Sequence, residues 1–211
     1  FLYTDHEIFL RELISNATDA MRKIQVMAAK GDYTGELGKL QIEVKVDKKK
    51  KTLTISDNGI GMTEKEVEQY INQIAFSSAE EFVKKYESSD EKNLIIGHFG
   101  LGFYSAFMVA NKVEFQTKSY LSDAEAVKWE CEGSVDYKTT VSKKKTRGTI
   151  ITLHIAEDSE EFLEESRILE LLNKYCPFMP FEIVFGKEKI SQKTGVKDKE
   201  GKEIEKEVEK P

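Results

Sequence analysis

Hydrophobic positions follow a helical period near the start of the chain and a two-residue period through most of its second half. Residues 7 to 29 include no glycine or proline. Their apolar members recur every three or four positions, on a stripe formed by Leu10, Ile14, Ala17, Met21 and Ile24. This spacing predicts one helix over Glu7–Ala29 with a single face in the core.

Alternation of apolar and polar residues predicts the strands. Two early segments, 40–46 and 52–56, flank a lysine-rich turn and predict a hairpin. Later alternating segments lie at 112–119, 126–132, 135–142, 149–155 and 181–185. We expect further helices at 64–75, 103–110 and 160–175. Thr63 and Glu66 form a capping-box pair at the start of the first of these.

This order of elements predicts an α+β fold, a two-layer sandwich in which a mixed, mainly antiparallel sheet carries helices on one face. We assign residues 1–186 to one folded domain. Residues 187–211 alternate lysine and glutamate with almost no apolar residue, so we expect them to form an unstructured linker. The chain starts without methionine, and we interpret it as part of a longer protein.

Composition narrows the class of protein. Hydrophobic residues make up 39% and charged residues 33%, which is typical of a soluble globular chain. The net charge of −6 argues against a nucleic-acid partner and against stable association with anionic membranes. No apolar run approaches the ~20 residues that span a bilayer. With two cysteines at no metal-binding spacing, we expect a reduced, cytoplasmic protein.

A polar stripe lies on the first predicted helix. Its members, spaced by four, three and four residues, are Glu12, Asn16, Asp19 and Lys23. Such a stripe can simply be a solvated face. However, Asn and Asp are poor interior helix formers, because their side chains compete for the backbone. A carboxylate one turn from an amide could instead activate water and hold Mg²⁺.

Two glycine-rich segments follow. In the first, Asp57 ends a strand and Gly59 and Gly61 allow a tight turn and close approach of a ligand. In the second, glycines at 97, 100 and 102 precede an apolar segment, a pattern that can present backbone N–H groups to phosphate. The first could equally be an ordinary strand-to-helix turn and the second a loop before a buried helix. Neither is a Walker loop or a dinucleotide fingerprint.

The order of these three segments resembles that of the Bergerat-fold ATPases, which include the ATPase chain of DNA gyrase, the 90-kDa heat-shock chaperones, sensor histidine kinases and MutL proteins. The match is most detailed with the 90-kDa heat-shock chaperones, particularly their bacterial branch. The blocks that carry it are Glu7–Ala20, Ser56–Thr63, Gly97–Ser105 and Arg147–Thr149. The similarity extends from the first residue to about Phe185.

The resemblance implies binding of ATP or ADP with Mg²⁺ and hydrolysis of ATP. Glu12 would be the general base that polarises the attacking water, and Asn16 would supply an oxygen to Mg²⁺. Asp57 would accept the adenine amino group. Thr149 and Gly61 would support Asp57 through water.

The remaining site residues are also implied by the resemblance. Met62 would pack on the base. Other residues that would line the nucleotide pocket are Asp19, Ala20, Lys23 and Ile71. Backbone contacts to phosphate would come from Gly100, Gly102 and Phe103. Residues from about 72 to 103 would form a lid.

Two residues depart from the pattern of the resembled family. Phe76 stands where many relatives carry a lysine, and Tyr70 where some carry Asn or His near the ribose. From the resemblance we also expect that the family's first strand and helix, which exchange between protomers on ATP-driven dimerisation, are largely absent from this sequence. The changes at Phe76 and Tyr70 bear on nucleotide affinity and lid movement, but not on the presence of the pocket itself.

The function implied is the ATP-binding, ATP-hydrolysing N-terminal domain of a molecular chaperone. Lid closure would drive clamping of a homodimer on unfolded or partly folded client proteins. Turnover by this part alone should be slow, because the family's catalytic arginine lies in a middle domain. One alternative is a histidine-kinase-like phosphotransfer domain, for which His6 lies too close to the predicted site helix to be the phospho-acceptor. Another is a nucleotide-gated binding module without catalysis.

Overall fold

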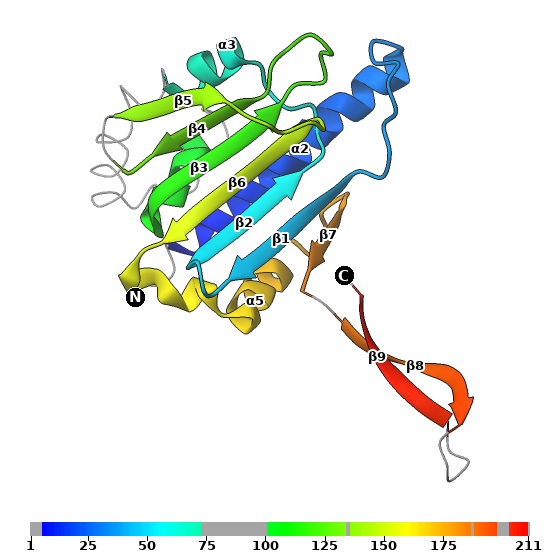
Figure 1. Cartoon of the computed structure of the whole chain (residues 1–211). Coiled ribbons are helices and arrows are strands. Elements are labelled where there is room, and N and C mark those ends of the chain that lie inside the picture. Colours follow the sequence, from blue (N-terminus) through cyan, green and yellow to red (C-terminus); the bar gives the residue numbers. More distant parts are fainter. Residues whose placement is uncertain (1–5, 73–100, 134–135, 187, 198–202, 211) are drawn as a thin grey trace.

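The computed structural model describes residues 6–72, 101–133, 136–186, 188–197 and 203–210. Its main feature is a seven-stranded sheet with the order β5-β4-β3-β6-β2-β1-β7 (Figure 1). The strands are β1 Gln41–Asp47, β2 Thr52–Asp57, β3 Ala110–Lys118, β4 Val127–Cys131, β5 Tyr137–Val141, β6 Gly148–Ile155 and β7 Glu182–Phe185. Their positions confirm the strands predicted from alternation, with ends that differ by a few residues.

Neighbouring strands of this sheet are antiparallel, except that β7 runs parallel to β1. The expected fold class, a mixed and mainly antiparallel sheet, is therefore confirmed. Two strands distant in sequence, β3 and β6, pair directly, and β6 also pairs with β2. This order places Thr149 opposite both Asp57 and Thr117.

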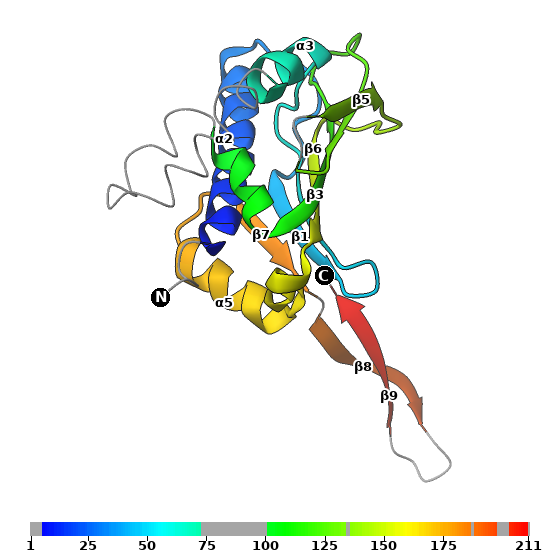
Figure 2. The same cartoon turned by 90° about the vertical axis from the view of Figure 1, so that its left-hand side faces the viewer.

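The helices pack on one face of the sheet, which Figure 2 shows edge-on. They are α2 Ile8–Lys30, α3 Glu64–Val67, the π-helix η1 Glu68–Asn72, the 3₁₀-helices η3 Leu101–Met108 and η4 Glu157–Leu163, and α5 Glu165–Tyr175. The apolar stripe predicted on α2 is buried in the core, together with residues from β1, β2, β3, β4 and β6. Within the described residues, no helix has the length and apolarity needed to cross a membrane.

Three helices differ from the sequence prediction. The helix expected at 64–75 is α-helical only to Val67 and then π-helical to Asn72, with residues 73–75 outside the described part. The apolar segment expected as a helix at 103–110 is a 3₁₀-helix that ends at Met108, because β3 begins at Ala110. The helix expected at 160–175 is broken at Glu164, whose backbone is extended.

The charged C-terminal segment also differs from expectation. We expected no regular structure there, but β8 (Glu188–Lys197) and β9 (Glu203–Lys210) form an antiparallel pair of their own. The pair extends away from the main sheet in both views (Figures 1 and 2). The backbone N–H and C=O groups of the two strands pair with each other, so this segment forms regular structure although it carries few apolar side chains.

Candidate functional site

The polar stripe on α2 is not uniformly solvated. Glu12 is buried, with only 8% of its surface exposed, whereas Asn16, Asp19 and Lys23 are exposed and Ala20 is half-buried. The Glu12 carboxylate accepts hydrogen bonds from Nε and Nη2 of Arg11 at 3.1 and 2.9 Å. Burying a carboxylate is costly unless it is paired, so Arg11 stabilises Glu12 in this position.

The end of the second glycine-rich segment lies against this stripe. A Cβ atom added to Gly102 would lie 2.8 Å from Glu12 Oε2 and 3.7 Å from Asn16 Nδ2. Only glycine therefore fits at residue 102 without displacing the carboxylate. The segment from 97 to 102 was predicted to approach phosphate, and its last glycine lies beside the two residues predicted to handle water and Mg²⁺.

Phe103 follows Gly102 but turns its side chain into the core. Its ring makes edge-to-face contacts with Phe115 and Trp129, with centroids 5.7 and 5.6 Å apart. It is 6% exposed. A ligand at this position could therefore contact Phe103 only through its backbone.

Asp57 lies at the end of β2, and the loop after it packs on α2. Its Oδ1 accepts a hydrogen bond from the backbone N–H of Gly59 at 2.8 Å, which fixes the turn. A Cβ atom on Gly59 would lie 2.7 Å from the Cβ of Ala20, and Ile60 N–H donates to the Ala20 carbonyl at 3.0 Å. The Asp57 loop thus contacts the same helix that carries Glu12, about two turns further along.

The surroundings of Asp57 raise the pKa of its carboxyl group above the value that the group has in water. Although the residue keeps some exposure to solvent, desolvation raises the pKa of its carboxyl group to about 6. Hydrogen bonds from the backbone N–H groups of Gly59 and Thr149 oppose this rise, as do the positive charges of Lys144 and Arg147. A carboxyl group in such surroundings gains strongly from a ligand that donates a hydrogen bond to it.

Neighbouring strands complete this side of the site. Thr149 Oγ1 lies 3.0 Å from Thr117 Oγ1, and Thr117 Oγ1 accepts a hydrogen bond from Met62 N–H at 2.9 Å. Gly61 has φ +65°, and a Cβ there would lie 1.9 Å from the Lys118 carbonyl oxygen. Asp57, Gly61, Met62 and Thr149 therefore gather at one end of β2, β3 and β6.

Thr117 was not predicted as a site residue. It is fully buried and links Met62 to Thr149, although it lies 32 residues from Thr149 in the sequence. A threonine in a strand gives no signal of its own, since β-branched residues favour strands in general. Only the pairing of β3 with β6 shows that its hydroxyl faces the predicted site.

Other predicted residues lie outside this group or outside the described residues. Ile71 is buried in η1, and its carbonyl accepts a hydrogen bond from the Tyr104 hydroxyl of η3. Tyr70 is half exposed. Gly100, Phe76 and most of the lid expected over 72–103 fall outside the described residues.

The residues present are compatible with Mg²⁺ bound together with a nucleotide. Asn16 presents an exposed side-chain amide one helical turn after Glu12, and an amide oxygen is a ligand that Mg²⁺ accepts. In the described part of the chain, no group of three His, Cys, Asp or Glu side chains is placed to hold a metal ion. Mg²⁺ bound through one protein oxygen would share its coordination with phosphate and water, as is usual for this ion.

Comparison with known proteins assigns the chain to a family. Residues 3–166 match the family model described as "Histidine kinase-, DNA gyrase B-, and HSP90-like ATPase". The chain is 56% identical over 205 residues to chaperone protein HtpG of Bacteroides thetaiotaomicron, covering 97% of this chain and 28% of that protein. It is 56% identical over 187 residues to chaperone protein HtpG of Porphyromonas gingivalis strain W83, covering 89% and 27%.

A more distant relative shows the same correspondence. Chaperone protein HtpG of Desulfitobacterium hafniense is 42% identical over 209 residues, covering 98% of this chain and 34% of that protein. The chain thus spans about a quarter to a third of the length of these relatives. Because the family model covers most of the chain, this protein belongs to the family of histidine kinase-, DNA gyrase B- and HSP90-like ATPases.

Proposed function

We propose that this domain binds ATP and hydrolyses it as the nucleotide-binding part of a molecular chaperone. The observation that carries the proposal is the convergence of two separate glycine-containing segments on α2. Gly102 lies against Glu12 and Asn16, and Gly59 lies against Ala20. The relatives reported above, which share 42 to 56% of their aligned residues with this chain, are named chaperones, which supports the same function.

We propose that Asp57 reads the adenine base. Its carboxylate would accept the amino group of the base, and the hydroxyl of Thr149 and the backbone at Gly61 would hold a water beside it. The raised pKa of the Asp57 carboxyl group reflects its desolvation, which a hydrogen-bond donor on the base would partly offset. A base without the amino group would leave this acceptor unpaired, at about 1–3 kcal/mol. Met62, which lies beside Thr117, would pack on the base.

We further propose that Glu12 activates the water that attacks the γ-phosphate. Its buried carboxylate is held by Arg11, so a water in line with the phosphorus needs only to approach Glu12 within hydrogen-bond distance. Asn16 would offer its amide oxygen to Mg²⁺, which when bound offsets the charge on the phosphate oxygens. Backbone N–H groups at Gly100, Gly102 and Phe103 would contact phosphate, and Asp19, Lys23 and Ile71 would line the site.

The larger assembly belongs to the proposal as well. In a longer protein, residues 1–186 would form the nucleotide-binding domain with a lid over about 72–103, and 187–211 would lead to the next domain. The full-length protein would act as a cytoplasmic homodimer on unfolded or partly folded clients. The alternative of a histidine-kinase-like domain has less support, because the relatives reported above are named chaperones.

Nucleotide binding and hydrolysis can be separated with two variants of the full-length protein. We expect Glu12→Ala to keep its affinity for ADP and to lose ATP hydrolysis, because Glu12 acts on the water. We expect Asp57→Asn to lose ADP affinity, because the amide presents a donor toward the adenine amino group. Calorimetric titration with ADP and a single-turnover ATP assay measure the two properties. Equal loss of ADP affinity in both variants would contradict the assigned roles.

A further inference from the structure

Arg147 has no role in the proposed reaction, yet it makes a dense set of contacts beside the site. Nη1 donates hydrogen bonds to the backbone carbonyls of Asn58 and Gly59, the second at 3.1 Å. Nη2 donates to the carbonyl of Leu37, and Nε lies 3.3 Å from the Tyr33 hydroxyl. The guanidinium carbon also lies 5.5 Å from the centroid of the Tyr33 ring. One side chain therefore joins two segments that are distant from it in sequence.

The two carbonyls that Arg147 binds on one side directly follow Asp57. Their orientation sets the path of the backbone as it leaves β2, and so sets the direction of the Asp57 side chain. The guanidinium is a planar fork with five donors, which suits it to hold several carbonyls at fixed angles. Lysine could donate from a single nitrogen only and could not bridge both segments in the same way.

Asn58 is a second residue that ties the loop after Asp57 to the chain between α2 and β1. Asn58 Nδ2 donates to the carbonyl of Lys39 at 2.6 Å, and Asn58 Oδ1 accepts from Gln41 N–H at 3.1 Å. With Arg147, this side chain ties the 57–59 loop to the connection between α2 and β1. The loop is therefore fixed to α2 by Ile60 and to the 33–41 connection by two side chains.

The position of Arg147 is set by the residue after it. Gly148 has φ +108°, and a Cβ there would lie 2.2 Å from the Asp57 carbonyl oxygen. The backbone at 148 thus passes directly against Asp57, in a conformation that favours glycine. This close passage brings Arg147 over the loop and brings Thr149 beside the Asp57 carboxylate.

We propose that Arg147 is a positioning residue for adenine recognition, which holds the 57–59 loop against the 33–41 connection so that the Asp57 carboxylate is aligned before the nucleotide arrives. The inference rests on the proposed function, because it takes Asp57 as the group that reads the base. Its consequence is specific. Without Arg147 the 57–59 loop can move. This movement weakens the hydrogen bond between Asp57 and the adenine amino group more than it weakens the protein's contacts with the rest of the nucleotide.

The test compares two ligands in the full-length protein by calorimetric titration. They are ADP and purine riboside 5′-diphosphate, which lacks the 6-amino group. For the unaltered protein we expect ADP to bind about ten-fold or more tightly than the analogue, because the analogue leaves Asp57 unpaired. For Arg147→Met we expect the ratio of the affinity for ADP to the affinity for the analogue to fall toward one, mainly because ADP binds more weakly. Lys145→Met, which removes an exposed positive charge two residues before Arg147, should keep the preference for ADP.

The possible results distinguish a failure of the adenine contact of Asp57 from a failure of the positioning role of Arg147. If the unaltered protein binds both ligands equally, the adenine contact of Asp57 is wrong, whatever Arg147 does. If it prefers ADP and Arg147→Met keeps that preference, the positioning role of Arg147 is overturned. If Arg147→Met does not fold, as judged by thermal unfolding, Arg147→Lys carries the test. It keeps the charge but not the bridge, so we expect a reduced preference, and an unchanged one overturns the inference.

Discussion

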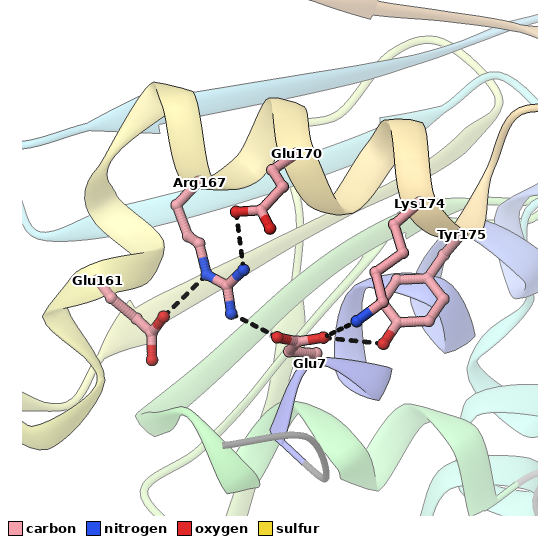
Figure 3. A network of polar contacts seen from close by, with 6 residues as sticks. All are labelled: Glu7, Glu161, Arg167, Glu170, Lys174 and Tyr175. Atoms are coloured by element: carbon pink, nitrogen blue, oxygen red, sulfur yellow. Dashed lines mark hydrogen bonds and ion pairs between the residues drawn. The ribbon is translucent and has the colours of Figure 1, made fainter.

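Glu7 precedes the first residue of α2 and joins that helix to α5 through a polar network (Figure 3). Its carboxylate accepts hydrogen bonds from Lys174 Nζ at 2.7 Å, from the Tyr175 hydroxyl at 2.8 Å and from Arg167 Nη2. The Glu7 side chain is 8% exposed. Arg167 is itself held by Glu161 and Glu170, so it is already oriented when it meets Glu7.

We expect Glu7→Gln to destabilise the domain because it removes the charge and keeps the shape. Desolvation raises the pKa of the Glu7 carboxyl group, but the hydrogen bonds from Lys174, Arg167 and Tyr175 outweigh it. They lower the pKa from 4.5 to about 2. Converted to free energy, this difference is about 3 kcal/mol of stabilisation at neutral pH, which is an upper limit for the variant's loss.

The same shift predicts how the effect depends on pH. The native carboxyl group has the lower pKa, so its stabilisation is fully present above pH 4.5 and is lost as pH falls toward 2. At pH 4 the unfolded chain already binds most of a proton at this residue, and about 1 kcal/mol is lost. We therefore expect the gap between the unaltered protein and Glu7→Gln to narrow by about 1 kcal/mol between pH 7 and pH 4.

Urea unfolding at both pH values measures the free energy of unfolding. The matched control is Glu164→Gln, because Glu164 also accepts from a lysine, Lys48, at 2.7 Å, but both side chains are more than half exposed. Exposed pairs contribute little, so the control should change stability by less than about 1 kcal/mol. The stabilising role of Glu7 is refuted if Glu7→Gln lowers the free energy of unfolding no more than this control does, or if the loss is the same at pH 7 and pH 4.

Two further predictions concern the site. Because the pKa of the Asp57 carboxyl group is about 6, protonation should remove its acceptor and weaken ADP binding about ten-fold between pH 7 and pH 5. Titrations across this range check it, and an affinity independent of pH would contradict the role of Asp57. Gly102→Ala should lower ATP hydrolysis in the full-length protein by about a hundred-fold, because the new Cβ would lie 2.8 Å from Glu12 Oε2 and displace it. A turnover assay measures this, and normal turnover would mean that the contact is not needed.

Local features of the chain were readable from the sequence because they depend on short-range physics. The apolar stripe of α2 follows from helical periodicity, and its residues are buried as predicted. The capping box at Thr63 and Glu66 forms in full, because its hydrogen bonds join residues three positions apart. The alternating segments became strands for the same reason, since period-two alternation fits one buried face.

Two features could not be predicted from local sequence patterns: the 3₁₀ form of η3 and the strands of the C-terminal segment. The η3 segment is a 3₁₀-helix, in which the Ser105 hydroxyl donates to the Gly102 carbonyl at 2.5 Å, and the strand that begins at Ala110 limits its length. Composition alone favoured an α-helix there. The β8–β9 pair likewise depends on backbone hydrogen bonds between two segments, which the polar composition of each segment does not reveal.

For the candidate site too, some features follow from the sequence and others only from the tertiary structure. The sequence by itself determined which residue types could serve, because Glu12 and Asn16 share a helical stripe and Asp57 precedes two glycines. It did not determine which of them meet. Only the tertiary structure brought Gly102 onto Glu12, placed β6 between β3 and β2, and set Arg147 against carbonyls nearly ninety residues away. Contacts at such separation depend on the strand order and on close backbone packing, and no local pattern of residue types encodes either.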